Sequence, residues 1–250
     1  MLIKLRGYFL VSVLLFLGAC TAKYNLVKSA REEYAINDKI AVDSNIVKAY
    51  LPYKKELDAE MNKIIGYTAV ALTKKSNLPE SVLGNFFADA VLAQAKKIDS
   101  TIDFALPTTN GGLRNDLAKG PITVANVFEL MPFENEAVLF KLKGTDVLDL
   151  LKFIAASGGQ PVSGLKMNIN DKVPENIFIN GKAFDINKDY QVLTSDYIAS
   201  GGDDAKGFAN PISKKVLGLK IRDAILKEVS AIHLDGKKIN ATLDGRITKN

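Results

Sequence analysis

Segments with helical periodicity alternate irregularly with strand-like segments along this chain, and that order limits the folds open to it. Helical spacing is clearest at 81–91, 123–131 and 144–155, and a last helix is expected from about Leu217 to Val229. Strand-like runs are predicted at 64–72, 102–106, 137–142, 165–169 and 190–194. Two more, at 177–179 and 182–184, flank Asn180-Gly181, a pair typical of two-residue hairpins. Hairpins between neighbouring strands favour an α+β fold over a doubly wound parallel sheet. We therefore predict an α+β fold, formed by a single domain with a mixed β-sheet and packed helices.

The first twenty residues have the pattern of an export signal. Lys4 and Arg6 precede an apolar run, 8–17, which is too short to span a bilayer. The segment closes with Leu17-Gly18-Ala19-Cys20, and Cys20 is the one cysteine of the chain. This order resembles the bacterial lipobox, which implies lipidation of Cys20 and a lipid-anchored protein of the bacterial cell envelope. Alternatively, the segment is an ordinary secretory signal with a chance cysteine.

The remaining chain is predicted to hold one folded domain. Residues 1–19 are assigned to the lipoprotein signal peptide, 20–44 to a polar tether and 45–250 to the domain. Residues 21–42 also fit an initial strand, and the sequence does not decide between these two interpretations. No internal repeat is evident, and the domain is long enough to build a core without disulfides.

Several classes of function are disfavoured by residue types that the chain lacks. His233 is the single histidine, so histidine-rich metal sets and a Ser-His-Asp triad are improbable, and we expect no metal site and no cofactor in this chain. The sequence has neither GxxxxGK[ST] nor GxGxxG. The formal charge is +5, and the lysines are scattered rather than clustered, so nucleic acid is not an expected partner.

A glycine-rich loop, Thr109-Asn110-Gly111-Gly112-Leu113-Arg114, is the first of three candidate binding segments. Consecutive glycines let backbone N–H groups approach a ligand closely. Arg114 offers a rigid fork of donors for a phosphate or a carboxylate. The alternative is a plain turn with a solvated arginine.

The other two segments each carry an aromatic residue. In Met131–Asn135, Phe133 offers a stacking surface and Asn135 an adaptable amide, unless Phe133 simply packs in the core. The segment 195–203 contains Tyr197, the glycine pair Gly201-Gly202 and the carboxylate of Asp203. Two facing rings form a slot for a flat heterocycle, and a carboxylate at the rim accepts hydrogen bonds from ribose hydroxyls. Alternatively, Tyr197 caps the core and Asp203 is a solvated turn residue.

In this order the segments resemble the C-terminal domain of 5'-nucleotidases. The resemblance also includes LGNFFADA (83–90), Ile122-Thr123, Lys143-Gly144, Val162-Ser163-Gly164 and Asp244-Gly245-Arg246-Ile247, and extends over about 65–247. It implies that Phe133 and Tyr197 sandwich a base and that Asp203 holds ribose hydroxyls. It further implies that Arg114 faces the phosphate or ribose side and that Asn135 contacts the base. The predicted substrate-binding residues are Asn110, Gly111, Gly112, Arg114, Phe133, Asn135, Tyr197, Gly201, Gly202 and Asp203.

The sequence departs from the family pattern at several points. The family loop usually reads NGGGIR, so that Thr109 stands at the family's asparagine. The second ring is Tyr rather than the commoner Phe, and 78–81 has none of the basic residues of some members. Family enzymes also carry an N-terminal metallophosphatase domain with a dimetal site, which generates the hydroxide nucleophile. Residues 20–64 contain nothing that matches that domain.

Two functions are favoured, and a structural surface protein on the same fold is a weaker third option. In the first, the chain is the nucleotide-substrate-binding domain of a 5'-nucleotidase-type phosphohydrolase that acts in nucleotide breakdown with a separate metallophosphatase chain. Divalent metals are then expected only on that partner, no residue of this chain is catalytic, and the chain is not expected to hydrolyse alone. In the second, it is a non-catalytic surface lipoprotein that binds nucleosides or nucleotides.

Overall fold

The computed structural model describes residues 28–37 and 40–250, so the predictions for the signal segment and Cys20 lie outside the described part. The chain divides between Ala49 and Tyr50 into two units, which we describe separately. In the first unit, 28–37 has no regular secondary structure and its side chains are exposed. Across the described ranges, no helix is long and apolar enough to cross a membrane.

The predicted mixture of helices and strands is confirmed. The helices are α2 (Ser44–Met61), α3 (Val82–Lys96), α4 (Val124–Leu130), α5 (Gly144–Ala156), α6 (Asp196–Ala199) and α7 (Ile221–Leu234). The strands are β1 (Ile64–Thr68), β2 (Phe104–Leu106), β3 (Gly120–Thr123), β4 (Glu136–Lys143), β5 (Leu165–Asn170), β6 (Val173–Ile179), β7 (Lys182–Ala183), β8 (Asp189–Ser195), β9 (Ser213–Lys220) and β10 (Ile247–Lys249).

A four-stranded mixed sheet, ordered β2-β8-β4-β9, organises the domain. Strands β2 and β8 are parallel, whereas β4 is antiparallel to both of its neighbours, β8 and β9. A second sheet has the order β10-β5-β6-β7, and β1 pairs with β3 in a separate ribbon. Parallel and antiparallel pairs occur together in both four-stranded sheets, as the predicted mixed α+β class requires.

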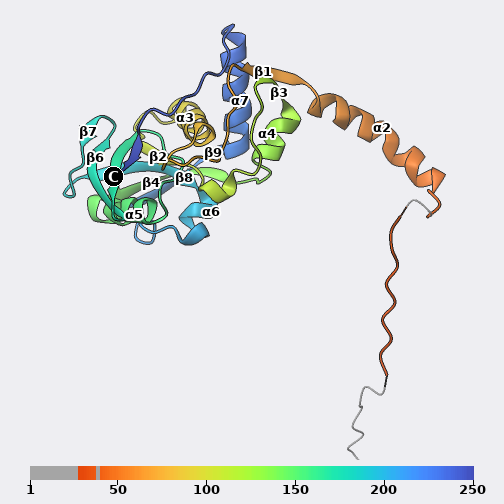
Figure 1. The fold of residues 1–250 in the computed structure, drawn as a ribbon, viewed down its shortest axis with the longest axis horizontal. Coiled ribbons are helices and arrows are strands. Elements are labelled where there is room, and N and C mark those ends of the chain that lie inside the picture. Colours follow the sequence, from red (N-terminus) through yellow and green to blue (C-terminus); the bar gives the residue numbers. More distant parts are fainter. Residues whose placement is uncertain (1–27, 38–39) are drawn as a thin grey trace, which may run out of the picture. The chain divides into compact units, whose positions relative to one another are not determined.

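Both faces of the central sheet are covered by apolar residues, because successive side chains along each strand point into two different cores. In β4, Ala137 and Leu139 join the core built by α3, α4 and α7, while Val138, Phe140 and Leu142 join the core built with α5 and the second sheet. Figure 1 shows α3 and α5 on opposite sides of β2, β4 and β8. The sheet is therefore a buried middle layer, and its edge loops are the parts free to bind ligands.

Local signals in the sequence identify several element boundaries correctly. Ser81 caps α3, its hydroxyl accepting the N–H of Gly84. Thr123 caps α4 in a capping box with Asn126. The hairpin between β6 and β7 turns at Asn180-Gly181 with φ values of 49° and 75°, as the sequence predicts.

The prediction of a last helix from Leu217 to Val229 is wrong at its start. Residues 213–220 form strand β9, and α7 begins at Ile221. Leu217 and Leu219 are buried while Gly218 between them is exposed, which is the two-residue period of a strand. Strands β3 and β10 are absent from the predicted elements; each is four residues or fewer and is stabilised by a partner distant in sequence.

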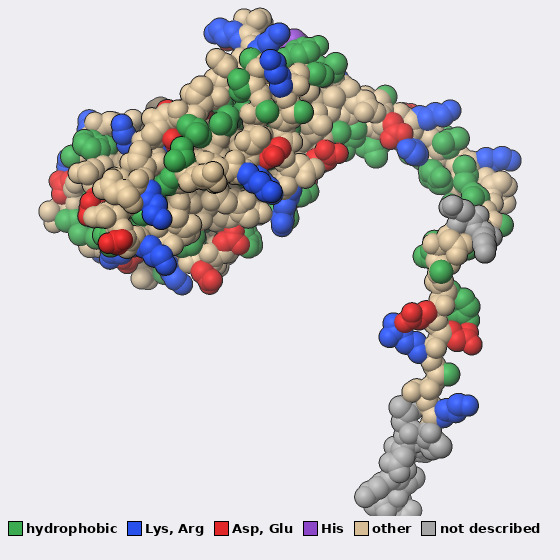
Figure 2. Space-filling view, viewed as in Figure 1, with side chains coloured by type: hydrophobic (Ala, Val, Ile, Leu, Met, Phe, Trp, Pro, Cys, Tyr) green, Lys and Arg blue, Asp and Glu red, His purple; other side chains and the backbone are tan. Residues whose placement is uncertain are grey.

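Charged side chains of both signs are interspersed over the face of the folded domain seen in Figure 2. On the surface of the domain several charged side chains form exposed pairs, such as Lys152 with Asp149 and Lys141 with Asp189. Exposed pairs of this kind contribute little to stability. They fit the interpretation of the scattered lysines as solvated surface groups.

Candidate functional site

The topology of the central sheet brings the three predicted loops to one edge. Strands β2 and β8 are parallel neighbours, so the segments that follow them, 107–114 and 195–203, leave the sheet at the same edge. Strand β4 runs antiparallel to β8 with Ala137 opposite Ser195, so the segment 131–135 enters the sheet at that edge as well. Segments far apart in the sequence therefore meet at one end of the sheet.

These loops enclose a cavity of about 340 Å³. Its walls contain seven of the ten residues predicted to bind substrate, together with two that were not predicted. The predicted ones are Gly111, Gly112, Arg114, Phe133, Asn135, Tyr197 and Asp203, and the others are Thr108 and Ser195. The structure thus brings both predicted rings, the guanidinium and the carboxylate to one cavity.

Tyr197 forms one wall of the cavity and is held at both ends. It follows the N-cap Ser195 in the short helix α6, and its hydroxyl donates to Asp203 Oδ1 at 3.0 Å. A Cβ on Gly202 would lie 2.5 Å from the Tyr197 ring, so glycine allows the close approach. The ring is about half exposed and does not cap the core. The hydrogen bond to Asp203 and the nearby negative charge raise the pKa of Tyr197.

Phe133 forms another wall and also contacts the core. It is partly buried against the core of α3, α4 and α7, so the alternative interpretation of Phe133 as a core residue is partly correct. The Arg114 guanidinium lies 5.0 Å from the ring centroid, in cation–π contact. Arg114 is itself anchored by its backbone N–H, which donates to Leu130 O at 2.9 Å. A cation thus lies beside an aromatic surface.

Asn135 is oriented by a carboxylate from the opposite loop. Its Nδ2 donates to Asp196 Oδ1 at 3.0 Å, and the same oxygen accepts the backbone N–H groups of Glu136 and Tyr197. One N–H of Nδ2 is committed to Asp196, so the second N–H and the amide oxygen of Asn135 are left for a ligand.

Three predicted residues do not line the cavity. Asn110 donates from Nδ2 to Gly159 O at 2.9 Å and from its backbone to Gln160, so it ties the glycine loop to the end of α5. Gly201 has a φ of 89°, a left-handed conformation that turns the chain after α6. Gly202 lies directly against the Tyr197 ring. Asn110, Gly201 and Gly202 therefore shape the loops rather than line the cavity.

Residues outside the three loops hold the walls in place. Lys74 Nζ donates to the carbonyls of Leu113 and Arg114, both at 3.0 Å. Arg222, at the start of α7, is buried, donates to Phe133 O at 3.3 Å and pairs with Glu134. Its guanidinium also lies 4.0 Å from the Phe128 ring centroid. Arg222 therefore fixes the backbone that carries Phe133.

One signal in the sequence could have identified Arg222. Arg222, Ile225 and Val229 follow helical spacing and are all buried in α7, so an arginine stands on the apolar stripe of that helix. A charged residue in such a position needs a partner. Placing the start of this helix at Leu217 obscures the pattern.

We predict that the pairs made by Glu134 weaken in acid. Its bonds with Lys220 and Arg222 lower the pKa of Glu134 from its ordinary value of 4.5. A lowered pKa stabilises the fold above the unfolded-state value, and the contribution is lost as pH falls through the folded-state value. Glu134→Gln should therefore be less stable than the wild-type protein at pH 7.

Chemical denaturation at a series of pH values measures the difference. The gap between wild-type and Glu134→Gln proteins should close as pH is lowered below about 4. Glu129→Gln is the matched control, because Glu129 is an exposed residue of α4. A gap that stays constant down to about pH 2 would contradict the role of the Glu134 charge.

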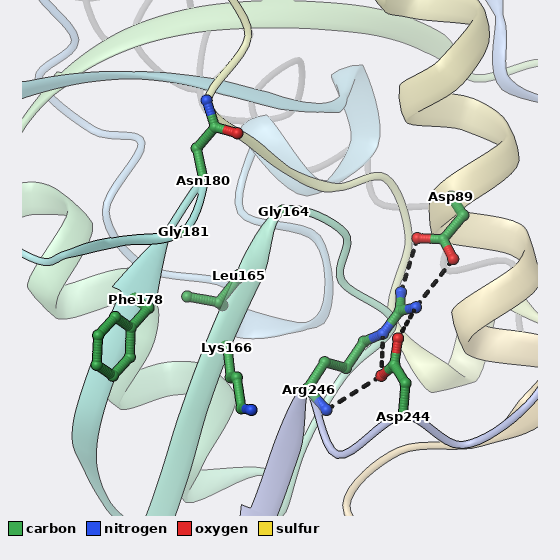
Figure 3. Close-up of a pocket in the computed structure, with 9 residues that line it drawn as sticks. All are labelled: Asp89, Gly164, Leu165, Lys166, Phe178, Asn180, Gly181, Asp244 and Arg246. Atoms are coloured by element: carbon green, nitrogen blue, oxygen red, sulfur yellow. Dashed lines mark hydrogen bonds and ion pairs between the residues drawn. The ribbon is translucent and has the colours of Figure 1, made fainter.

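A second cavity, of about 580 Å³, contains charged groups that are already paired with each other (Figure 3). All five N–H donors of Arg246 are used: its guanidinium donates to Asp89, Asp244 and the carbonyl of Val162 at 2.7–2.9 Å. Asp89 belongs to α3, so the ion pair with Arg246 connects the start of β10 to that helix. The cluster thus joins 83–90 to 244–247, two of the segments on which the resemblance rests.

No group of three or more His, Cys, Asp or Glu side chains within 28–37 and 40–250 is placed to hold a metal ion. The first cavity combines two aromatic surfaces, a guanidinium, an amide oxygen and a carboxylate. Such a set suits a small molecule with a flat ring, hydroxyl groups and an anionic substituent.

Comparison with known protein families gives one family match, to the model described as "5'-nucleotidase, C-terminal domain", over residues 64–210. Among curated proteins, the chain is 29% identical over 214 residues to the trifunctional nucleotide phosphoesterase protein of Bacillus subtilis. It is 30% identical over 182 residues to the 5'-nucleotidase of Vibrio parahaemolyticus. These matches use 78% and 67% of this chain but 14% and 30% of the relatives.

A solved structure gives the same picture. The 5'-nucleotidase precursor of Thermus thermophilus superposes with a TM-score of 0.66 and 27% sequence identity. The match covers 81% of this chain and 42% of that protein. The chain thus spans less than half the length of each of these relatives.

Proposed function

This chain belongs to the 5'-nucleotidase C-terminal domain family, and from that membership we propose that it binds the nucleotide substrate for a phosphohydrolase whose metal centre lies on a separate metallophosphatase chain. The binding role is supported by the cavity, which is lined by Phe133, Tyr197, Arg114 and Asp203. The single histidine of the chain favours a hydrolytic dimetal centre on another polypeptide.

The residues of the cavity divide the work of recognition in this proposal. Phe133 and Tyr197 hold the base between them, and the amide oxygen of Asn135 accepts a donor on its edge. Arg114 places a fixed positive charge near the phosphate or ribose. Asp203 lies at the ribose. In this proposal the nucleophile is generated at the metal centre of the partner chain, and the role of these groups is to bind and orient the substrate.

Attachment of the domain to a membrane of the cell envelope through lipid on Cys20 is part of the same proposal. It is supported by the order of Leu17, Gly18, Ala19 and Cys20 behind a short apolar run. Mass spectrometry of protein from a bacterial membrane fraction measures it: acylation at Cys20 is expected, and an unmodified Cys20 thiol on the mature protein would contradict it.

Calorimetric titration of the purified chain tests the binding role. Adenosine, AMP and a UDP-sugar are suitable probes, and we expect at least one of them to bind with a Kd below about 1 mM, which corresponds to about −4 kcal/mol. If none binds in that range, the cavity is not a nucleotide site in this chain.

Mixing the chain with a lone metallophosphatase domain tests the partnership. A stable complex and a gain in nucleotide hydrolysis over either component alone are expected. If nucleotides bind but no complex or gain is found with candidate partners, the chain is instead a binding protein without chemistry of its own.

A further inference from the structure

Helix α2 carries apolar side chains that the described part of the chain does not cover. Tyr50, Tyr53 and Leu57 follow helical spacing, so they point to one side of the helix, and they are 47%, 74% and 58% exposed. Met61 continues this row, which we call the α2 stripe, and the exposed Leu51 lies beside it. None of the residues of α2 is buried.

Such a helix needs a surface to pack against. Helices in proteins are stabilised mostly by the packing of their apolar face, and short isolated helices are marginal in water. Pro52 lies inside α2, where it removes a backbone hydrogen bond and weakens the helix further. The α2 stripe is therefore expected to be covered in the assembled protein.

The charges of α2 argue against a membrane as that surface. Lysines and acidic residues balance in this helix, which contains Lys48, Lys54, Lys55, Glu56, Asp58 and Glu60. Amphipathic helices that lie on membranes have a polar face rich in basic residues. Tyrosines, by contrast, are enriched where proteins meet, because the ring buries apolar area while the hydroxyl stays near water. The composition of α2 thus favours a protein.

A second copy of α2 is too small to be that protein surface. The α2 stripe extends from Tyr50 to Met61, a length of about 18 Å. Two helices that meet along about 18 Å bury far less than the roughly 1,200 Å² of a stable interface. Leu51 also widens the apolar face beyond the narrow seam of a two-helix coiled coil. A globular partner with an apolar groove fits better.

The end of α2 is joined to the elements that carry the first cavity. The carbonyl of Lys63, two residues after the helix, accepts the backbone N–H of Val124 at 3.1 Å, at the start of α4. Helix α4 is about 10 Å long, and the segment after it carries Phe133 and Asn135 into the cavity wall. The end of α2 is thus about one short helix away from the cavity.

We propose that the α2 stripe is the docking surface for the separate metallophosphatase chain and seats in an apolar groove of that protein. This inference rests on the proposed partnership and names the surface that forms it. A partner seated there has its metal centre within reach of a nucleotide bound in the cavity.

Site-specific photo-crosslinking of the full chain in cells that produce it tests the inference. The variant Tyr53→p-benzoylphenylalanine places the crosslinker on the α2 stripe, and Ala59→p-benzoylphenylalanine places it on the opposite side of the helix. The Tyr53 variant should form an adduct with a polypeptide that carries a dimetal phosphatase ligand set, and the Ala59 variant should not. An adduct with a second copy of this chain, an adduct with lipid only, or no adduct would overturn the inference.

Titration of the captured metallophosphatase measures the contribution of the α2 stripe. Leu57→Glu puts a charge into the apolar contact and should raise the Kd of the complex at least about tenfold. Ala59→Glu is the matched control, because Ala59 is exposed on the opposite side of α2, and its Kd should stay within about twofold of the wild-type value. Both variants should bind nucleosides as the wild-type protein does, because the lining of the first cavity contains no residue of α2.

The outcomes separate this inference from the function on which it rests. If a metallophosphatase raises nucleotide hydrolysis but binds Leu57→Glu as tightly as wild type, the inference fails and the partnership stands. If no metallophosphatase associates with the wild-type chain, the partnership fails and the inference fails with it. Nucleoside binding by the isolated chain is decided separately by calorimetry.

Discussion

Replacing Arg246 with methionine is expected to lower the free energy of unfolding by about 3 kcal/mol, the largest loss of stability that we predict. All five N–H groups of Arg246 are bonded, and its side chain is 13% exposed. The substitution leaves Asp89 and Asp244 facing each other without their common partner. Because both carboxylates are about half exposed, water recovers part of the cost.

Thermal denaturation measures this effect. For a domain of this size, a loss of about 3 kcal/mol corresponds to a fall in Tm of about 6–12 °C. Arg31→Met is the matched control, because Arg31 forms an exposed pair with Glu33 and should change stability by less than about 0.5 kcal/mol. Equal melting temperatures for Arg246→Met and wild type would show that the bonds of Arg246 with Asp89 and Asp244 do not stabilise the fold.

The loss of unfolding free energy caused by Arg246→Met should also depend on pH. The hydrogen bond from Arg246 lowers the pKa of Asp244. Stability from this pair is therefore present above the unfolded-state pKa of aspartate and is lost as pH falls through the lowered value. The difference between wild-type and Arg246→Met proteins should narrow below about pH 4.

Removing the two rings of the cavity is expected to have the largest effect on binding. Stacking of a base on an aromatic side chain is worth about 1–3 kcal/mol, so Tyr197→Ala should raise the Kd of a bound nucleoside by about 5-fold to 150-fold. Tyr197 is half exposed and outside the core, so this variant should remain folded. Phe133→Ala should weaken binding similarly but also lower stability, because Phe133 packs partly on the core.

Phe178→Ala is the control for the loss of an aromatic ring. Phe178 is partly exposed and lines the second cavity rather than the first. Calorimetric titration should give the wild-type Kd for this variant. If Phe178→Ala weakens nucleoside binding while Tyr197→Ala does not, the ligand binds in the second cavity.

Local patterns are enough to predict most elements of the fold. Ser81, Thr123 and the Asn180-Gly181 pair signal their helix starts and hairpin through contacts within a few residues. Strand β10 has no such signal, because its three residues are held by pairing with β5, about 80 residues earlier. Gly218 in the middle of β9 likewise gives no sign of a strand.

The loops of the candidate site can be predicted from the sequence, whereas the residues that support them cannot. Glycine pairs and aromatic residues at strand ends mark the loops of Arg114, Phe133 and Tyr197 in the sequence. The contacts of Arg222 and Lys74 with the backbone of those loops depend on three-dimensional packing. Likewise, the bonds of Tyr197 and Thr109 to one carboxylate form only when the two loops meet.

The buried position of Arg222 means that affinity for a ligand could be adjusted from α7, a helix that contributes no residue to the lining of the first cavity. Its guanidinium reaches the Phe133 backbone from α7, about 90 positions further along the chain. Random mutagenesis followed by selection for altered nucleoside affinity should therefore recover changes at the start of α7 as well as in the cavity walls. The ligand preference of the cavity could therefore change through substitutions in α7 while the residues that line the cavity stay the same.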